Sequence, residues 1–302
     1  MYVRVDDVVY DLKKESELKV GGEGTVSMLS NTMAVKIYHD YNEEMEAKLT
    51  ECLDYNVYAS VEVASLTNSG YCVANQIDLR RTASLFCHLH DAIAQIHSGP
   101  FCIGDLRAAN IMFKPSTSGP WDIAIMDVDS WEVYITDISQ DRWGCEVDNS
   151  RYHYCTAIHD DVVHPDLINT NYSQLMKYHD WYAFAHQLAT CLLKCNPFEE
   201  GRVAGMTDIE RKIKGISCFC GSLGGVALTL EEQINIKRLG SDMTGLLQRW
   251  LTGKEKGVFP RSAILDFIQG LCVCRSCGLQ HFERQPGETH CVRCGNRLVL
   301  RW

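Results

Sequence analysis

The end of the chain carries two Cys-x-x-C pairs, and their spacing constrains what this part can fold into more than any other feature. Cys274 and Cys277 form the first pair and Cys291 and Cys294 the second, with thirteen residues between the pairs and a glycine after each. Two such turns bring four thiolates within tetrahedral reach of one Zn²⁺. So short a tail buries too little apolar surface to fold by itself, so the metal would supply the folding energy. The alternative, a redox dithiol, needs only one pair and normally follows a strand of a βαβ unit.

Four protein thiolates leave no open position on a zinc ion, which predicts a structural site rather than a catalytic one. Two nearby histidines, His281 and His290, are expected at the surface. The sequence does not say whether this ribbon docks on the rest of the chain.

Composition places the chain among globular proteins. It has 302 residues, 46% of them hydrophobic, and a formal net charge of -10, which disfavours broad binding to nucleic-acid phosphates. The first residues carry acidic groups where a signal peptide would have its apolar region, and no apolar run of about 18 residues occurs. We therefore expect a cytoplasmic protein without membrane contact, whose other eleven cysteines stay reduced.

Hydrophobic patterning changes near residue 80. The preceding part combines runs of β type with one helical segment at 42–53, as in a small sheet with a helix on it. Two apolar helices are expected at 84–97 and 180–193, the second at the centre of the larger unit, with further helices at 230–239, 241–251 and 263–271. The β-type runs are YVRV (2–5), TVSML (25–29), AVKIY (34–38), YASVEV (58–63) and YCVANQI (71–77).

A glycine-rich turn, GGEGTV at 21–26, precedes a strand-borne Lys36. Glycines let backbone amides approach phosphate oxygens, and a lysine on a strand reaches the same phosphates as a point charge. The alternative is an ordinary glycine hairpin with a solvated lysine. In the nucleotide reading, the residues that cover the phosphates are Gly21, Gly22, Gly24 and Val26.

Downstream of Lys36, the segment 42–53 offers three glutamates. Glu46 best fits an inward register because Leu49 and Leu53 share its face, whereas Glu43 and Glu44 read as a solvated surface. Glu46 is therefore the candidate for positioning Lys36.

The stretch CIGDLRAANIMF contains the candidate catalytic groups. Asp105 could orient a hydroxyl and accept its proton, Arg107 could neutralise a transferred phosphoryl group, and Asn110 could bind magnesium. A second stretch, DIAIMDVDSW, ends an apolar strand with Asp127 and Asp129, which are hard oxygen ligands of the kind Mg²⁺ takes. Taken alone, each stretch could instead be a capped polar turn.

The order of these motifs resembles the eukaryotic-like protein kinase family. The resemblance covers roughly residues 15 to 270 and extends to Pro165-Asp166, which looks like the Ala-Pro-Glu closing an activation segment, and to Asp180 at a helix start. By the same resemblance, Arg261 would pair with Asp166. The closest similarity is to bacterial Ser/Thr kinases with D-V-D in place of D-F-G and a cysteine-rich module. Such kinases are commonly encoded beside a PP2C-type phosphatase and a von Willebrand-type domain protein, which are the partners this resemblance implies.

The resemblance implies a two-lobed α+β fold. The small β-rich lobe would span 1–77, the larger helical lobe 78–271, and the zinc ribbon 272–302. ATP and Mg²⁺ would bind between the lobes, with adenine near Asn75 and Ile77, and the product would be a phosphorylated serine or threonine on a protein.

Three departures from the family pattern matter. Lys19 stands where the first glycine of the loop would be, and Ile103 and Gly104 replace the usual His-Arg. Without that arginine no receiver for an activation-loop phosphate is evident, so activity is expected not to depend on one. The string DLRAAN also resembles tyrosine kinases, although six residues are few against the Ser/Thr pattern of the rest.

Two other functions stay open. The departures also fit a pseudokinase that binds nucleotide or serves as a scaffold. A small-molecule kinase of the aminoglycoside or choline type shares D-x-x-x-x-N and a downstream aspartate, although Pro165-Asp166, Asp180 and Arg261 belong to the protein-substrate pattern.

Overall fold

A computed structural model of the chain describes its backbone over most of the second half and over separate strands of the first. Before residue 66 the description is of the strand backbones. The expected helix at 42–53 and the runs at 58–63 and 71–77 lie outside the described residues. The described ranges are 2–5, 8–11, 17–20, 24–30, 33–38, 64–65, 79–114, 121–127, 131–135, 138–140, 146–148, 150–155, 158–168, 175–282 and 290–296.

Small antiparallel sheets form the amino-terminal part, as the alternating runs predict. One pairs β1 (Tyr2–Val5) with β2 (Val8–Asp11). A second has the order β3-β4-β5, formed by Glu17–Val20, Gly24–Ser30 and Met33–Tyr38. Successive strands of this sheet are joined by short connections, so each pairs with its neighbour in sequence.

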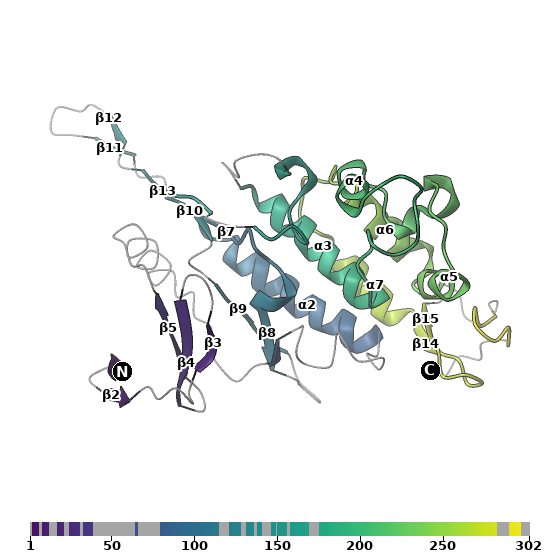
Figure 1. Ribbon diagram of the computed structural model, residues 1–302, viewed down its shortest axis with the longest axis horizontal. Coiled ribbons are helices and arrows are strands. Elements are labelled where there is room, and N and C mark those ends of the chain that lie inside the picture. Colours follow the sequence, from purple (N-terminus) through teal and green to yellow (C-terminus); the bar gives the residue numbers. More distant parts are fainter. Residues whose placement is uncertain are drawn as a thin grey trace.

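Two further sheets contain β7 and β8, the strands before and after the loop that carries Asp105. The first has the order β6-β8-β9, from Ala64–Ser65, Ile111–Lys114 and Asp122–Ile125. The second has the order β13-β10-β7, from Arg151–His153, Glu132–Ile135 and Phe101–Cys102. A hairpin of β11 (Ile138–Gln140) and β12 (Glu146–Asp148) lies beyond the second sheet, far from the helices (Figure 1).

The described α-helices lie from residue 79 onward and gather on one side of the molecule (Figure 1). The two long helices α2 and α3 pack against each other, and α2 also packs against α7. The helices are α2 (Leu79–Ile96), α3 (Lys177–Leu193), α4 (Asp208–Lys214), α5 (Leu230–Lys237), α6 (Gly240–Leu251) and α7 (Arg261–Gln269), with the 3-10 turns η2 (Ala108–Asn110), η4 (Pro165–Leu167) and η5 (Cys218–Gly224).

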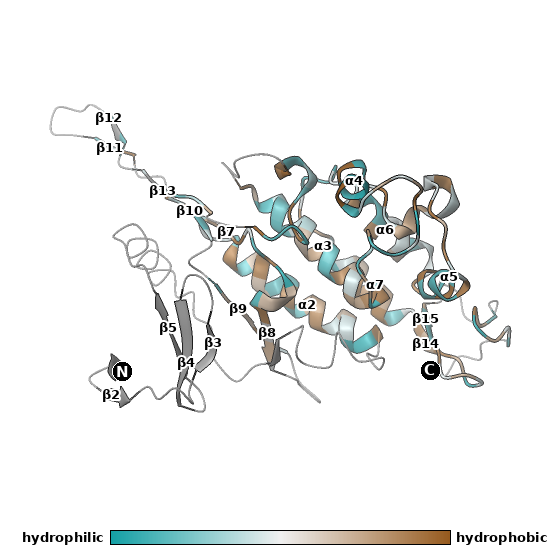
Figure 2. Cartoon of the chain, in the orientation of Figure 1, coloured by the Kyte–Doolittle hydropathy of each residue, from teal (hydrophilic) through white to brown (hydrophobic). Residues whose placement is uncertain are grey.

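The apolar faces expected from the sequence form the core. In α2 the residues at helical spacing are buried, including Phe86, Leu89 and Ile93, and apolar and polar residues alternate along this helix in Figure 2. Helix α3 is buried on all sides through most of its length, which goes beyond the apolar face that the sequence predicted, and its Phe184 contacts the rings of Phe86 and Phe259. A helix buried all round is central to a core, which places α3 at the centre of the helical part.

The last described elements are β14 (Leu271–Val273) and β15 (Gln280–Phe282), an antiparallel pair beside the helices. In all, the protein is a mixed α and β structure with helices and small antiparallel sheets. Among the described helices, none combines the length and the apolar character that crossing a membrane requires.

Candidate functional site

The stretch CIGDLRAANIMF folds as a loop between β7 and β8. Cys102 ends β7, the residues from Ile103 onward form the loop, and η2 leads directly into β8. Although both are polar, Asp105 and Asn110 are only 6% and 5% exposed. Buried polar groups need hydrogen-bond partners, so the contacts of these two residues define the loop.

Both carboxylate oxygens of Asp105 are engaged. The Asn110 side-chain amide donates to the Asp105 carbonyl oxygen and to its Oδ2, at 3.0 Å each. Arg107 forms an ion pair with the same Oδ2, with its Nε 3.0 Å away. The backbone N–H of His159 donates to Oδ1 at 3.0 Å. The structure therefore brings Asp105, Arg107 and Asn110 together around one carboxylate, and adds a contact from a segment fifty-four residues later.

A second carboxylate, Asp180 near the start of α3, holds the beginning of this loop. It is completely buried, and its two oxygens accept the backbone N–H groups of Ile103 and Gly104 at 2.8 Å each. The His97 imidazole also donates to Asp180, with Nε2 2.8 Å from Oδ2. A buried carboxylate with three donors fixes the backbone that precedes Asp105.

Asp127 lies at the same end of the β8-β9 hairpin as Asn110. Ile111 pairs with Ile125, and the N–H of Met126 donates to the Asn110 carbonyl at 2.7 Å. Asp127 adopts a left-handed conformation with φ of 66°. Few residues other than glycine do so, and those that do are concentrated at functional sites.

Among the residues expected in the nucleotide site, three belong to described strands. Gly24 begins β4, and Val26 is the Cα partner of Lys36 across the β4-β5 ladder. Val26 also pairs with Lys19 of β3, so Lys19, Val26 and Lys36 form one row across this sheet. The other candidates, Gly21, Gly22, Glu46, Asn75, Ile77 and Asp129, lie outside the described residues.

The expected pairing of Arg261 with Asp166 is wrong. Arg261 opens α7 on the side that faces α2, and its guanidinium binds Asp91 of α2 through two hydrogen bonds of 2.7 and 2.8 Å. Asp166 instead pairs with Lys256, whose Nζ lies 2.7 Å from Oδ2. A bidentate arginine–carboxylate pair needs the two planar groups side by side. The packing of α7 against α2 places Arg261 in this arrangement with Asp91 and not with Asp166.

Asp166 lies close to two buried histidines. Oδ1 lies 2.5 Å from His164 Nδ1 and 3.2 Å from His179 Nε2. These groups are close enough to hold a metal ion, but His179 Nδ1 accepts the Met176 N–H, which leaves the ring proton on Nε2, facing Asp166. We therefore interpret the group as polar packing around Asp166 rather than as a metal site.

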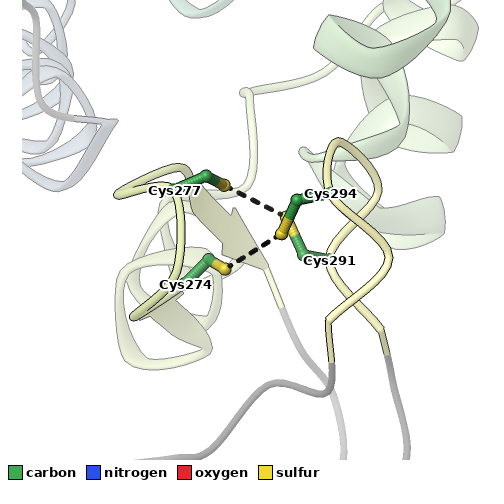
Figure 3. A group of neighbouring side chains, drawn as sticks. All are labelled: Cys274, Cys277, Cys291 and Cys294. Atoms are coloured by element: carbon green, nitrogen blue, oxygen red, sulfur yellow. Dashed lines mark hydrogen bonds between the residues drawn. The ribbon is translucent and has the colours of Figure 1, made fainter.

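The four cysteines of the tail lie together, as their spacing predicts (Figure 3). Their sulfur atoms are all within 4.8 Å of one another, with 3.6 Å between Cys274 and Cys294 and 3.5 Å between Cys277 and Cys291. This cluster could hold a zinc ion.

Each Cys-x-x-C pair is closed by the glycine that follows it. Gly278 and Gly295 have φ of 72° and 71°, and their N–H groups donate to the carbonyls of Cys274 and Cys291 at 2.8 Å. Donation from the backbone N–H groups of Cys277 and Ser276 lowers the pKa of Cys274 to about 6. The backbone therefore favours the thiolate form of Cys274.

The expectation that His281 lies at the surface is wrong, whereas His290 is exposed. His281 is 2% exposed because it lies in β15 against the cluster, with Nε2 3.2 Å from Cys291 Sγ. The local sequence carried no signal for this, because alternation along β15 places His281 on the face opposite Phe282, and only the fold brings the cysteine cluster to that face. A hydrogen bond to a metal-binding sulfur is a common outer contact in such sites.

The cysteine cluster is packed onto the helices. Ile234 of α5 belongs to one buried apolar cluster with Cys274, Leu279 and Cys291, and the N–H of Phe282 donates to the Arg238 carbonyl at 2.8 Å. The ribbon is thus attached to the helical part by both apolar and polar contacts.

Sequence reasoning missed residues whose importance comes from distant partners. His97 supports Asp180, Lys256 pairs with Asp166, and Glu132 accepts hydrogen bonds from residues in three later positions. No spacing rule joins such residues, so the local sequence gave no signal for them.

No protein-family model matches the chain, and no curated protein matches it at a significant level.

Proposed function

We propose that the protein is a Mg-ATP-dependent protein kinase, with lobes at 1–77 and 78–271 and a zinc ribbon at 272–302. It would transfer the γ-phosphate of ATP to serine or threonine hydroxyls of a protein. The observation that carries this proposal is the arrangement around Asp105. Asn110 and Asp127 lie at the same end of the β8-β9 hairpin. Asp105 is held by the Asn110 side chain and by the backbone N–H of His159.

The residues support phosphoryl transfer in separate roles. Asp105 would orient the acceptor hydroxyl and take its proton, and Arg107 would neutralise charge on the transferred group. Asn110 uses its amide nitrogen on Asp105, so its amide oxygen faces the other way and, with the Asp127 carboxylate, offers the hard oxygen atoms that suit Mg²⁺. Bound magnesium would neutralise charge on the phosphates.

The glycine turn and Lys36, positioned by Glu46, would bind the phosphates of ATP. Their support is the sequence order together with the β4-β5 register, in which Val26 and Lys36 are partners. Catalysis in this proposal rests on positioning and charge neutralisation, which is what phosphoryl transfer requires of a protein.

The test is transfer of label from γ-labelled ATP with Mg²⁺. Purified protein is incubated alone to test for autophosphorylation, with a mixture of acceptor proteins, and with free aminoglycoside or choline. Asp105→Asn and Lys36→Met should each lower the rate about a hundredfold or more, whereas Asp266→Asn, an exposed aspartate of α7, should leave it unchanged. Site mapping by mass spectrometry should find phosphoserine or phosphothreonine.

Other outcomes contradict the proposal in distinct ways. Label on the small alcohol alone would indicate a small-molecule kinase. ATP binding without transfer in any form would indicate a nucleotide-binding scaffold. Phosphotyrosine alone would overturn the Ser/Thr assignment.

The cysteine cluster is proposed to hold one structural Zn²⁺. Its support is the set of four sulfur atoms within 4.8 Å of one another. Metal analysis should give one zinc per chain, and Cys277→Ser should lower it, whereas Cys220→Ser, which lies outside the cluster, should not. Zinc content well below one in the wild type would contradict this assignment.

A further inference from the structure

Glu132 opens β10, the central strand of the β13-β10-β7 sheet. Its Cα partner is Cys102 of β7, the residue before the loop that carries Asp105. Although it is a carboxylate, Glu132 is only 3% exposed. Charged groups are rarely buried unless they are paired or hydrogen-bonded, so its partners need an explanation.

Three donors reach the Glu132 carboxylate from later parts of the chain. The N–H of Leu175 donates to Oε1 at 2.7 Å, and the Tyr152 hydroxyl donates to the same oxygen. The N–H of Cys155 donates to Oε2 at 3.5 Å. Burial raises the pKa of Tyr152, so its hydroxyl keeps the proton that it donates. One side chain thus joins β10, the end of β13 and the residues just before α3.

The two residues held through their backbones also fill the space beside Gly104. A Cβ built on Gly104 would lie 2.7 Å from Leu175 Cδ1 and 2.9 Å from Cys155 Sγ, and Gly104 has φ of 71°. No larger side chain fits at this position without a shift of these neighbours. A side chain at this position, such as the arginine of the family pattern, would therefore meet Leu175 and Cys155.

We propose that Glu132 is a positioning residue of the phosphotransfer site. It holds Cys155 and Leu175 against Gly104, and thereby fixes the segment whose His159 N–H binds Asp105, without phosphorylation of that segment. This inference rests on the proposed function, since it takes Asp105 as the catalytic carboxylate.

The segment is also held at its other end, in agreement with this role. Lys212 of α4 is buried and donates to the carbonyls of Asp160 and Asp161 at 2.6 and 2.9 Å. These residues directly follow His159. The turn that contacts Asp105 is therefore fixed on both sides by side chains of the protein itself.

The experiment compares wild type with Glu132→Ala, Glu132→Gln and Glu146→Ala. Glu146 is an exposed glutamate of β12 on the same segment, so its variant is the matched control. Each protein is shown by mass spectrometry to be unphosphorylated. The measurements are kcat, the KM for ATP, and residue-resolved hydrogen exchange of the Cys155 and Leu175 amides.

The expected result is a split between these quantities. Unphosphorylated wild type should be active, and Glu132→Ala should lower kcat roughly tenfold or more through loss of the bonds to buried donors, with the KM for ATP unchanged. The Cys155 and Leu175 amides should exchange faster. Glu146→Ala should match wild type in kcat and in exchange. Glu132→Gln, which keeps one acceptor oxygen, should give values between those of wild type and Glu132→Ala.

Distinct results would overturn the proposal. Unchanged kcat and unchanged exchange in both Glu132 variants would remove the positioning role, and a wild type active only after phosphorylation of the segment would refute independence from phosphate. If Glu132→Ala does not fold, Glu132→Gln decides by the same two readouts. A wild type that transfers no phosphate would refute the proposed function. Hydrogen exchange of the Cys155 and Leu175 amides would still test whether Glu132 holds these two residues.

Discussion

At the scale of single residues, the candidate site is built from carboxylates whose partners are far away in sequence. Asp180 was recognised from the sequence as a helix-start aspartate, but its bonds run to Ile103 and Gly104, seventy-seven and seventy-six residues earlier. Local spacing identifies residue types suited to a chemistry. It cannot identify the distant residues that position these side chains through hydrogen bonds, because such hydrogen bonds form only when the chain is folded.

The role of Asp180 predicts a loss of stability when its charge is removed. In Asp180→Asn one oxygen becomes an NH₂ group that faces a donor, so a buried N–H loses its acceptor. The free energy of unfolding in urea should fall by roughly 2 kcal/mol. The exposed Asp266→Asn should match wild type, and equal stability of the two variants would show that Asp180 does not hold the loop.

Gly104 allows a test that separates backbone strain from packing. Gly104 and Gly205 have nearly the same φ, 71° and 68°, but a Cβ at Gly205 meets nothing within 4 Å. Alanine at either position pays the left-handed strain, about 1 to 2 kcal/mol. Gly104→Ala should be less stable than Gly205→Ala by a further ~1 to 3 kcal/mol for overpacking. Equal losses of unfolding free energy would contradict the close packing of Cys155 and Leu175.

At the scale of secondary-structure elements, hydrophobic period was the most informative property of the sequence. The helices expected at 84–97 and 180–193 correspond to α2 and α3, and most of the apolar residues expected on their inner faces are buried. The pairing of α7 was wrong, because the sequence gives a charge at Arg261 but not the direction in which α7 presents it. Histidines inside α3 were likewise invisible as buried groups, since their burial depends on what packs around that helix.

One buried histidine of α3 predicts how stability depends on pH. His186 stacks on Phe198, and burial lowers its pKa to about 3. In the unfolded chain the group takes a proton below about pH 6.5, so its contribution to stability is complete above that pH. The contribution decreases as pH falls toward 3, by up to ~1.4 kcal/mol per pH unit.

The measurement is the urea unfolding free energy between pH 7.5 and pH 4.5. Wild type should lose stability toward acid more steeply than His186→Gln, which cannot bind a proton at this position. Other histidines with lowered pKa, His90, His164 and His179, keep some slope in both proteins. Parallel curves for the two proteins would show that His186 is not buried as a neutral ring.

At the scale of the whole molecule, the cysteine ribbon is part of the helical body rather than a separate tail. Phe282 stacks on Phe267 of α7, with ring centroids 5.6 Å apart, and fits against Gly240 and Gly270. The N–H of Leu79, the first residue of α2, donates to Gln280 at 2.5 Å. The sequence predicted from spacing alone that the four cysteines lie together, but it could not place the ribbon, since docking depends on surfaces formed by α2, α5, α6 and α7.

This docking predicts that the ribbon and the helices stabilise each other, so a mutation in the ribbon should also destabilise the helices. Phe282→Ala removes a ring that α7 and two glycines enclose, so the free energy of unfolding should fall by about 2 to 4 kcal/mol. The effect should be seen in hydrogen exchange of α7 and the start of α2 as well as in β14 and β15. Val273→Ala is the control, because Val273 is 53% exposed in the same ribbon. If Phe282→Ala instead speeds exchange only within β14 and β15 and leaves the helices protected, the ribbon is an independent unit. The energetic coupling between the cysteine cluster and the helical body would then be absent, however closely the two lie.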